Sequence, residues 1–410
     1  MYTMILDGEY PNDIRVRKEA ESLADSGIKI QVVTRWKKGQ ARKEIINGVQ
    51  VIRLGAHYSF RKKGVNDVLT ALFFFDFLFY WHLKSFFKKE VSSEIIHIHD
   101  LPLMRTIRIL LPRKYIVLDM HENYPEMLLA LKRTPKSLFK VIKDRLFFST
   151  KRWKKYERKA IRFPNHIIAV VDEMKEKIIR EYNIPSEEIS VISNYEKFDF
   201  QTVKNEDDFL FKKDVFYIVY VGGINPVRGL EIGINAVQSF QSSNTKVEFV
   251  ILGAGNKTYL DSLETLAQNL GVSNQVHLLG QKPFNQIAYY IHNAGANVIP
   301  HIKNAHTDHT IPHKLFQIMI SKSPLLVSDC KPFKRIIGQH NAGFVFEAEN
   351  IKSFKAQIEL MMSNPSLVDE RISNAFNLVK GDMNWESESQ KLIKLIKKLK
   401  DDKAGINSKM

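Results

Sequence analysis

The segment YIVYVGGINPVRGLE, residues 217–231, has the residue types of a phosphate-binding turn. Its apolar start predicts a strand that is buried on both faces, as in a parallel sheet. Gly222 and Gly223 at the end of this strand allow the backbone to approach a ligand closely. Arg228 then stands at the predicted helix start, where free N–H groups and a guanidinium favour an anion. The spacing matches neither the dinucleotide fingerprint nor a P-loop, and an ordinary tight strand-to-helix turn is the alternative interpretation.

Two predicted strands in the first half of the chain end in polar residues. His99 and Asp100 close one strand, and Asp119, His121 and Glu122 surround the end of the other. Sites of open parallel sheets gather at the carboxyl ends of strands, where imidazole and carboxylate groups can move a proton. The structural alternative has His121 bonded to backbone and Glu122 capping the next turn.

The segment HTDHTIPH, residues 306–313, brings His306, His309 and His313 close together in sequence. Pro312 interrupts any helical face, and no cysteine or fixed carboxylate completes a tetrahedral set of metal ligands. We therefore expect no metal at this segment. A contact of His309 with a bound substrate is the favoured interpretation.

Apolar strands alternate with helical stretches along the chain, which predicts doubly wound parallel sheets. A charged stretch without a clear period, residues 196–214, is the predicted linker. Two Rossmann-like α/β domains are expected, residues 1–200 and 201–384, with a basic helix over 385–402 returning to the first. The first helix is predicted to begin near Pro11. Strands are predicted at 2–6, 28–34, 49–54, 94–99, 115–120, 166–171, 217–221, 247–252, 276–279, 296–300 and 325–328.

The composition narrows the classes of partner. The chain has 410 residues, one cysteine and a formal net charge of +16, of which roughly +12 lies in residues 1–200. One cysteine excludes a disulfide framework, and the N-terminus does not resemble a signal peptide, so a cytoplasmic protein is expected. No nucleic-acid-binding module is recognisable. The basic half therefore favours a phosphorylated substrate or an anionic membrane surface.

Over nearly its whole length the chain resembles the family-4 glycosyltransferases, which are retaining enzymes of the GT-B fold. The order and spacing of several motifs carry the resemblance: PNDIRVRKEAESLADSGIKIQVV near the start, HIHD at 97–100, VLDMHENYPE at 117–126, VGGINPVRGLE at 221–231, ILGAG at 251–255, HKLFQIM at 313–319 and NWESESQKLIKLI near the end. The resemblance implies a nucleotide-sugar donor in the C-terminal domain, an acceptor mainly in the N-terminal domain, and reaction in the cleft between them. No metal or other cofactor is implied.

The resemblance also assigns roles to individual residues. Positioned cations would stabilise the negative charge that grows on the leaving diphosphate, and Arg228 and Lys314 are the candidates; solvated helix-end residues are the alternative. Near the acceptor, a carboxylate could take a proton or steady the developing sugar cation. The implied catalytic residues are Asp119, His121 and Glu122; the donor-binding residues are Gly222, Gly223, Arg228, Gly253, Gly255, His309, Lys314, Leu315 and Gln317; the acceptor or cleft residues are Gly8, Arg15, His99 and Asp100.

The chain departs from the family pattern at three positions. The family commonly has two glutamates separated by seven residues, and these positions hold His309 and Gln317. A basic residue often stands where Gly223 lies. The leading interpretation is an enzyme that transfers a hexose to a glycan or lipid-linked glycan acceptor in polysaccharide biosynthesis. The lost glutamates keep open a catalytically silent GT-B subunit that binds a partner or glycan, and a GT-B nucleotide-sugar epimerase is a third hypothesis.

Two aromatic and basic segments suggest contact with a membrane surface. Residues Leu69–Lys89 read LTALFFFDFLFYWHLKSFFKK, and Arg145–Lys159 combines aromatic residues with several lysines and arginines. Such a composition fits helices lying in a membrane interface, whereas Asp76 and His82 argue against a membrane span. We favour core packing with some membrane contact; a core helix with a basic exposed end and no membrane contact is the structural alternative. We expect a peripheral location on the inner face of the cell membrane.

Overall fold

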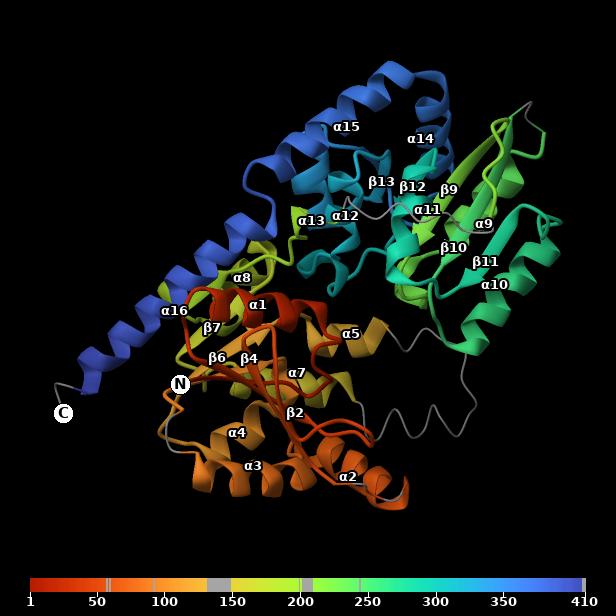
Figure 1. Ribbon diagram of the computed structural model, residues 1–410. Coiled ribbons are helices and arrows are strands. Elements are labelled where there is room, and N and C mark those ends of the chain that lie inside the picture. The colour runs from red at the N-terminus through yellow and green to blue at the C-terminus, as the bar shows by residue number, and fades with distance from the viewer. Residues whose placement is uncertain are drawn as a thin grey trace. The chain divides into compact units, whose positions relative to one another are not determined.

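The computed structural model describes residues 1–56, 58, 60–90, 93–130, 149–198, 200, 209–242 and 245–407, and the chain divides into two compact units (Figure 1). The first contains the described residues of 1–128, 137–193 and 388–407, and the second contains essentially those of 194–387. The chain therefore passes from the first unit to the second and returns within its last helix.

The first unit is built on an eight-stranded sheet with the order β3-β4-β2-β1-β5-β6-β7-β8. All pairings are parallel except that of β3 with β4. Its central strands are buried along their whole length, as expected for a parallel sheet with both faces covered. The strands are β1 (Tyr2–Ile5), β2 (Ile30–Arg35), β3 (Lys43–Ile46), β4 (Val49–Leu54), β5 (Ile95–His99), β6 (Tyr115–Met120), β7 (His166–Ala169) and β8 (Ile189–Val191).

Helices alternate with these strands. They are α1 (Ile14–Asp25), α2 (Phe60–Phe73), α3 (Phe77–Lys89), α4 (Met104–Leu110), α5 (Tyr124–Ala130), α7 (Thr150–Ala160), α8 (Asp172–Tyr182) and α16 (Trp385–Asn407). The prediction that the first helix begins near Pro11 was wrong by one turn. Asp13 is the N-cap, because its carboxylate accepts the backbone N–H groups of Arg15 and Val16.

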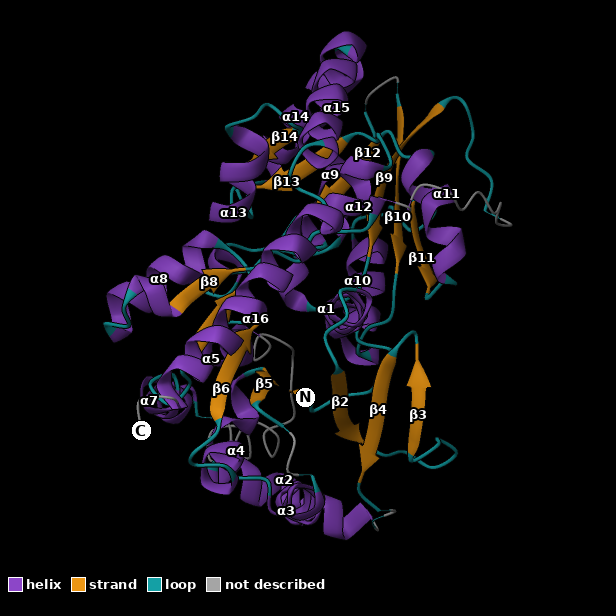
Figure 2. Cartoon of the chain, turned by 60° about the vertical axis from the view of Figure 1, so that its left-hand side comes forward, coloured by secondary structure: helices purple, strands orange, loops and turns teal. Residues whose placement is uncertain are grey.

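The second unit has a six-stranded, fully parallel sheet with the order β11-β10-β9-β12-β13-β14 (Figure 2). Residues of β9 alternate between the two faces. Ile218 and Tyr220 join the core beneath α9, α10 and α14, and Val219 packs on the opposite face. The strands are β9 (Val215–Val221), β10 (Lys246–Leu252), β11 (Val276–Gly280), β12 (Ala296–Ile299), β13 (Leu325–Ser328) and β14 (Phe344–Phe346). The helices are α9 (Glu231–Ser239), α10 (Lys257–Asn269), α11 (Ile287–His292), α12 (Lys314–Ile320), α13 (Lys331–Phe333), α14 (Ile351–Ser363) and α15 (Pro365–Lys380).

The aromatic segment Leu69–Lys89 forms parts of two helices rather than one. Asp76 is the N-cap of α3 and is itself buried, so the polar residue that interrupts the apolar run also breaks the helix. In the described ranges no single helix has the length and apolar composition to cross a membrane. The pair Lys62–Phe73 and Phe77–Lys89, bent by 90°, meets those criteria only together.

The second aromatic segment lies partly in the core. Residues 145–148 are outside the described residues, so the predicted contact of this part is not placed. Trp153 in α7 is 4% exposed and packs edge-on against Phe74 and Tyr156. Trp153 therefore packs in the core, as the favoured interpretation expects, and contact of this segment with a membrane stays a prediction.

Candidate functional site

Two glycine turns close the carboxyl ends of β9 and β10 in the second unit. Gly222 follows β9 with φ +138°, and Gly253 follows β10 with φ +146°, a backbone conformation that favours glycine. A Cβ atom at residue 253 would lie 1.9 Å from the Gly222 carbonyl oxygen, and one at Gly255 would lie 2.6 Å from the carbonyl oxygen of Ile224. Glycine is thus required at Gly253 and Gly255 because the two turns touch through their backbones, and at Gly222 because of its positive φ.

Lys314 is the first residue of α12, as the sequence predicts, and its side chain points into the unit. Its Nζ lies 3.8 Å from the centre of the Tyr220 ring, and a Cβ at Gly222 would come within 2.8 Å of it. Among the described residues this buried nitrogen has no hydrogen-bond partner. Burial, followed by the nearby charge of Arg228, lowers the pKa of Lys314 well below its usual value. The interpretation of Lys314 as a solvated residue is therefore wrong.

Arg228 does not begin the helix that the sequence predicts. It ends a short 3-10 helix, Pro226–Arg228, and α9 begins only at Glu231, because Gly229 adopts a left-handed conformation. The guanidinium Nη1 donates to His301 Nε2 at 2.8 Å, and its Nε is buried without an acceptor in the described residues. Burial, then Arg228 and Lys314, lower the pKa of His301 well below its usual value, so this imidazole is a neutral acceptor.

His309 and Gln317 stand where the family commonly has glutamates, and both form hydrogen bonds within the second unit. The ring of His309 donates from Nδ1 to the Ala305 carbonyl at 2.7 Å. Gln317 donates its side-chain amide to the Glu196 carboxylate at 2.8 Å. A carboxylate is therefore present beside position 317, supplied by a residue that the sequence analysis placed in a linker. Leu315, predicted to bind the donor, is fully buried and packs in the interior.

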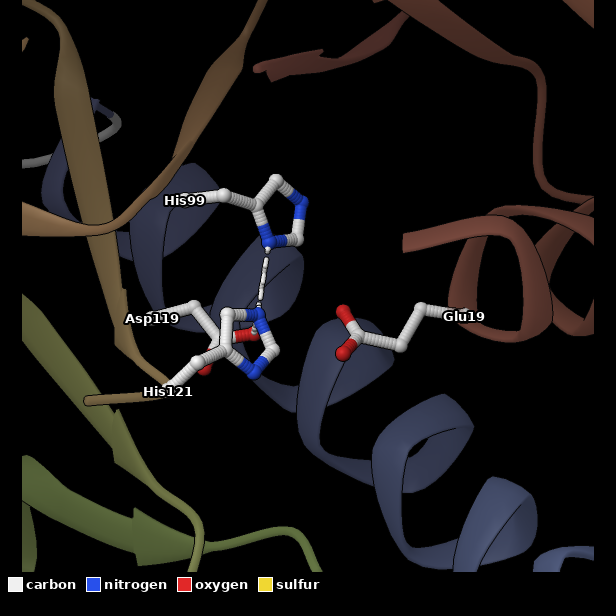
Figure 3. A group of neighbouring side chains, drawn as sticks. All are labelled: Glu19, His99, Asp119 and His121. Carbon is white, nitrogen blue, oxygen red and sulfur yellow. Dashed lines mark hydrogen bonds and ion pairs between the residues drawn. The ribbon is translucent and has the colours of Figure 1, made fainter. Parts of the chain in front are cut away.

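In the first unit, four polar residues of β5 and β6 meet on one buried face of the sheet. His99 pairs in register with Asp119, and the side chains of His97 and His121 lie on the same face. Asp119 Oδ2 lies 3.3 Å from His97 Nε2, 3.6 Å from His99 Nδ1 and 3.3 Å from His121 Nε2. His99 Nδ1 and His121 Nε2 are 3.1 Å apart (Figure 3). Glu19 of α1 faces this group, and the sequence analysis did not identify it.

Burial and proximity shift the pKa values of this group in opposite directions. Burial alone would raise the pKa of Asp119, but the three histidines lower it below its usual value. Burial lowers the pKa of His121 to about 4. Burial, followed by the charge of Asp119, raises the pKa of Glu19 well above its usual value. At neutral pH, His99 and His121 are therefore neutral, Asp119 is ionised and Glu19 is protonated.

A cavity of about 1090 Å³ opens in the first unit. The predicted acceptor residues Gly8, Arg15, His99 and Asp100 all line it, whereas Asp119, His121 and Glu122 do not. Aromatic side chains supply much of the remaining wall: Trp36, Tyr58, Phe79, Tyr124 and Trp153.

Two lining residues of this cavity are held in fixed conformations. Arg15 is fixed by a fork of hydrogen bonds to Asp13, at 3.2 and 3.0 Å. Asp100 has φ +68°, an uncommon conformation for a residue other than glycine. Such strain is often found at functional sites.

Two family models match the chain, one in each half. The model for Glycosyltransferase Family 4 matches residues 14–195, and the model for Glycosyl transferases group 1 matches residues 202–378. The two matches follow the two parallel-sheet units. The chain belongs to the family-4 glycosyltransferases, which confirms the resemblance seen in its sequence.

Similar proteins agree with this membership. The chain is 25% identical over 232 residues to the O-antigen chain mannosyltransferase RfbU of Salmonella typhimurium, an alignment that covers 55% of this chain and 60% of that protein. The structure resembles sucrose-phosphate synthase from Thermosynechococcus elongatus, with a TM-score of 0.77, 15% identity and coverage of 98% and 99% of the two chains. It also resembles Anabaena HepE in complex with UDP-glucose, with a TM-score of 0.70, 13% identity and coverage of 97% and 99%. These structures confirm the predicted GT-B fold.

Proposed function

We propose that this glycosyltransferase moves a hexose from a nucleoside diphosphate sugar to a glycan acceptor, with retention of the anomeric configuration. The observation that carries the proposal is the buried Nζ of Lys314, which lacks a hydrogen-bond acceptor in the described residues and lies near Arg228 and the Gly222 turn. An unpaired buried amine is costly for folding. A diphosphate would supply the acceptors that this group lacks.

The chemistry of sugar transfer explains why these groups would be placed together. As the bond between sugar and diphosphate breaks, negative charge grows on the leaving phosphate oxygens. Cationic groups in a site shielded from water stabilise this charge in the transition state. Arg228 is pre-oriented for this task by its bond to His301, and the glycine turns leave the backbone accessible. No metal ion is needed in this scheme, because two cations act on the diphosphate.

The acceptor would bind to the first unit, in the cavity lined by Gly8, Arg15, His99 and Asp100. Its mixed aromatic and charged wall suits a sugar, since the rings can stack on apolar sugar faces while polar groups bind hydroxyls. Glu122 does not line this cavity, but it stands two residues before Tyr124, which does; Glu122 remains our candidate for taking the acceptor proton. In this proposal His121 and Asp119 act behind the cavity wall, because both are buried.

A panel of nucleotides tests the donor directly. We expect one or more of UDP-, GDP- and ADP-hexoses to raise the unfolding temperature of the purified protein, and inorganic phosphate at the same concentration to raise it less. With the matching donor, slow hydrolysis or transfer should release the nucleoside diphosphate. If no nucleotide sugar is bound or turned over, the silent-subunit hypothesis replaces the proposal. Conversion of the donor sugar without an added acceptor would instead identify an epimerase.

The similarity to an O-antigen chain mannosyltransferase supports a role in polysaccharide biosynthesis. We propose a lipid-linked acceptor at a membrane surface. The exposed side chains of helices α2 and α3 suit a protein that acts at the inner face of a membrane. They expose Val65, Phe73, Phe77 and Trp81, of which Trp81 is 62% exposed. Exposed lysines flank them, including Lys62, Lys63, Lys88 and Lys89. Apolar side chains beside lysines are the chemistry of a helix that lies on an anionic lipid surface.

Vesicle binding measures this contact. We expect the protein to sediment with vesicles containing an anionic lipid and much less with zwitterionic vesicles. Trp81→Ser should weaken binding by about tenfold, because a large apolar side chain no longer enters the interface. Phe284→Ser is the matched control, since Phe284 is 57% exposed but belongs to the second unit. Equal binding by wild type and Trp81→Ser would contradict the assignment of this surface.

A further inference from the structure

Four buried side chains with metal-ligand chemistry converge in the first unit. Glu19 comes from α1, His99 from β5, Asp119 from β6 and His121 from the residue after β6. One ligand atom from each lies within 4.8 Å of all the others, and Figure 3 shows the carboxylate of Glu19 facing the two imidazoles. Within the described ranges, no other group of three or more histidine, cysteine or carboxylate side chains has the spacing needed to hold a metal ion.

The polar atoms of this group are poorly satisfied by the protein itself. Among the described residues, neither oxygen of Asp119 has a well-oriented hydrogen-bond donor, although His97 and His121 lie 3.3 Å from Oδ2. Glu19 Oε2, His99 Nε2 and His121 Nδ1 are likewise buried without a hydrogen-bond partner in the described ranges. Most buried carboxylate oxygens accept hydrogen bonds or bind metals. No lysine or arginine among the described residues forms an ion pair with Glu19 or Asp119; Arg15, one turn earlier in α1, is paired with Asp13. A metal ion bound between these groups would displace the proton of Glu19 and give the buried oxygens and nitrogens a common partner.

The spacing of the atoms fits a metal ion. The triangle of His99 Nδ1, His121 Nε2 and Asp119 Oδ2 has sides of 3.1, 3.3 and 3.6 Å. Two ligands bound at about 2.1 Å in tetrahedral geometry lie roughly 3.4 Å apart. A direct hydrogen bond between the two imidazoles explains the shortest side, but it leaves both oxygens of Asp119 without a well-oriented donor among the described residues. Glu19 would complete the set by a small movement of its flexible side chain.

We propose that Glu19, His99, Asp119 and His121 bind one divalent transition-metal ion, with Zn²⁺ as the best match. Two imidazoles and two carboxylates suit Zn²⁺ better than Mg²⁺ or Ca²⁺, which prefer oxygen ligands in larger numbers. Four protein ligands leave no open position, so the ion is structural rather than catalytic. It links α1 to β5 and β6 and thereby fixes Asp100 and Glu122, which directly follow two of the ligands. The proposal does not depend on the binding of a nucleotide sugar. The expectation that no metal is needed concerned sugar transfer, whereas this ion would stabilise the first unit.

Metal analysis of the full chain, purified without a histidine tag, tests the proposal first. We expect about one equivalent of zinc per chain. A strong chelator should remove it and lower the unfolding temperature, and Zn²⁺ should restore both, whereas Mg²⁺ should restore neither. Co²⁺ bound to the stripped protein should give the intense visible absorption of a tetrahedral site. Absence of bound metal, together with no change of unfolding temperature on adding Zn²⁺ or Co²⁺, would overturn the proposal.

A pair of variants locates the ion. Glu19→Gln keeps the size of the side chain and is expected to weaken zinc binding by about tenfold or more. His306→Ala is the matched control, because it removes a buried histidine from the histidine-rich segment of the second unit and should leave the affinity unchanged. Zinc binding that is lost in His306→Ala and retained in Glu19→Gln would refute the assignment. If Glu19→Gln does not fold, the metal content and the Co²⁺ spectrum of the wild-type chain decide the question.

Discussion

Arg228→Ala is expected to lower kcat/KM for sugar transfer by about 100-fold or more, the effect of removing one preorganised donor from a transition state. Arg228 Nη1 donates to neutral His301, and among the described residues its buried Nε has no acceptor. The guanidinium is therefore held in place, and no carboxylate of the described residues forms an ion pair with it. The loss should appear mainly in kcat, since charge on the leaving diphosphate is greatest in the transition state.

Two variants control this experiment. Arg228→Lys keeps the charge but loses the planar fork, so part of the activity should return. Lys257→Ala removes the same charge from an exposed position of α10 in the same unit, where Lys257 forms a surface ion pair with Asp261, and transfer should be unchanged. The unfolding temperatures show whether each variant folds. Near-normal turnover by a folded Arg228→Ala variant would refute the role of this residue.

The donor side of the site shows what local sequence can predict. Gly222, Gly253 and Gly255 could be recognised because a strand that ends in glycine is a local pattern, and the structure shows that these turns touch. His301 and Glu196 could not be identified as partners, because each reaches its partner across a long stretch of sequence: His301 to Arg228 and Glu196 to Gln317. A signal for His301 existed, since it follows a predicted strand at its carboxyl end, where site residues gather.

The acceptor side shows the same limit. The polar residues that end β5 and β6 could be predicted, and parallel pairing explains why they meet. Their burial could not, because it depends on how α1 covers this face of the sheet. Glu19 was missed for that reason: on a helix surface a glutamate is ordinarily solvated, and only the tertiary structure places this one beside Asp119.

Edge elements were also missed. The short strands β3, β8 and β14 contain three or four residues each, too few to show a period. By contrast, strands β4, β6 and β13, which are rich in buried apolar residues, match the predicted bounds. A pattern-based prediction therefore recovers the centre of each sheet and the edge strand β11 (Val276–Gly280), but it misses the other three edge strands.

Lys314→Met is expected to change stability and activity in opposite directions. Methionine fills similar space without the buried amine, so without a nucleotide the free energy of unfolding should rise by about 1–3 kcal/mol. Sugar transfer should nevertheless fall by about 100-fold, because the leaving diphosphate loses a cation. Thermal or denaturant unfolding and donor kinetics on the same preparation measure both effects. Lys322→Met, which substitutes the lysine near Phe376 in the same unit, controls for the loss of one positive charge.

The pH dependence separates this role from a packing effect. In the free protein the pKa of Lys314 lies well below its usual 10.5, so the folded state binds fewer protons than the unfolded state as long as the pH lies between these values. The stability of the wild type therefore rises with pH across this window, and the stability advantage of Lys314→Met shrinks as the pH increases. A bound diphosphate raises the pKa of Lys314, so nucleotide binding should take up a proton and weaken as the pH rises from the lower pKa to the higher. Calorimetry in buffers of different ionisation enthalpy measures this uptake. A Lys314→Met variant that retains the same uptake and the same transfer rate would show that Lys314 does not contact the donor.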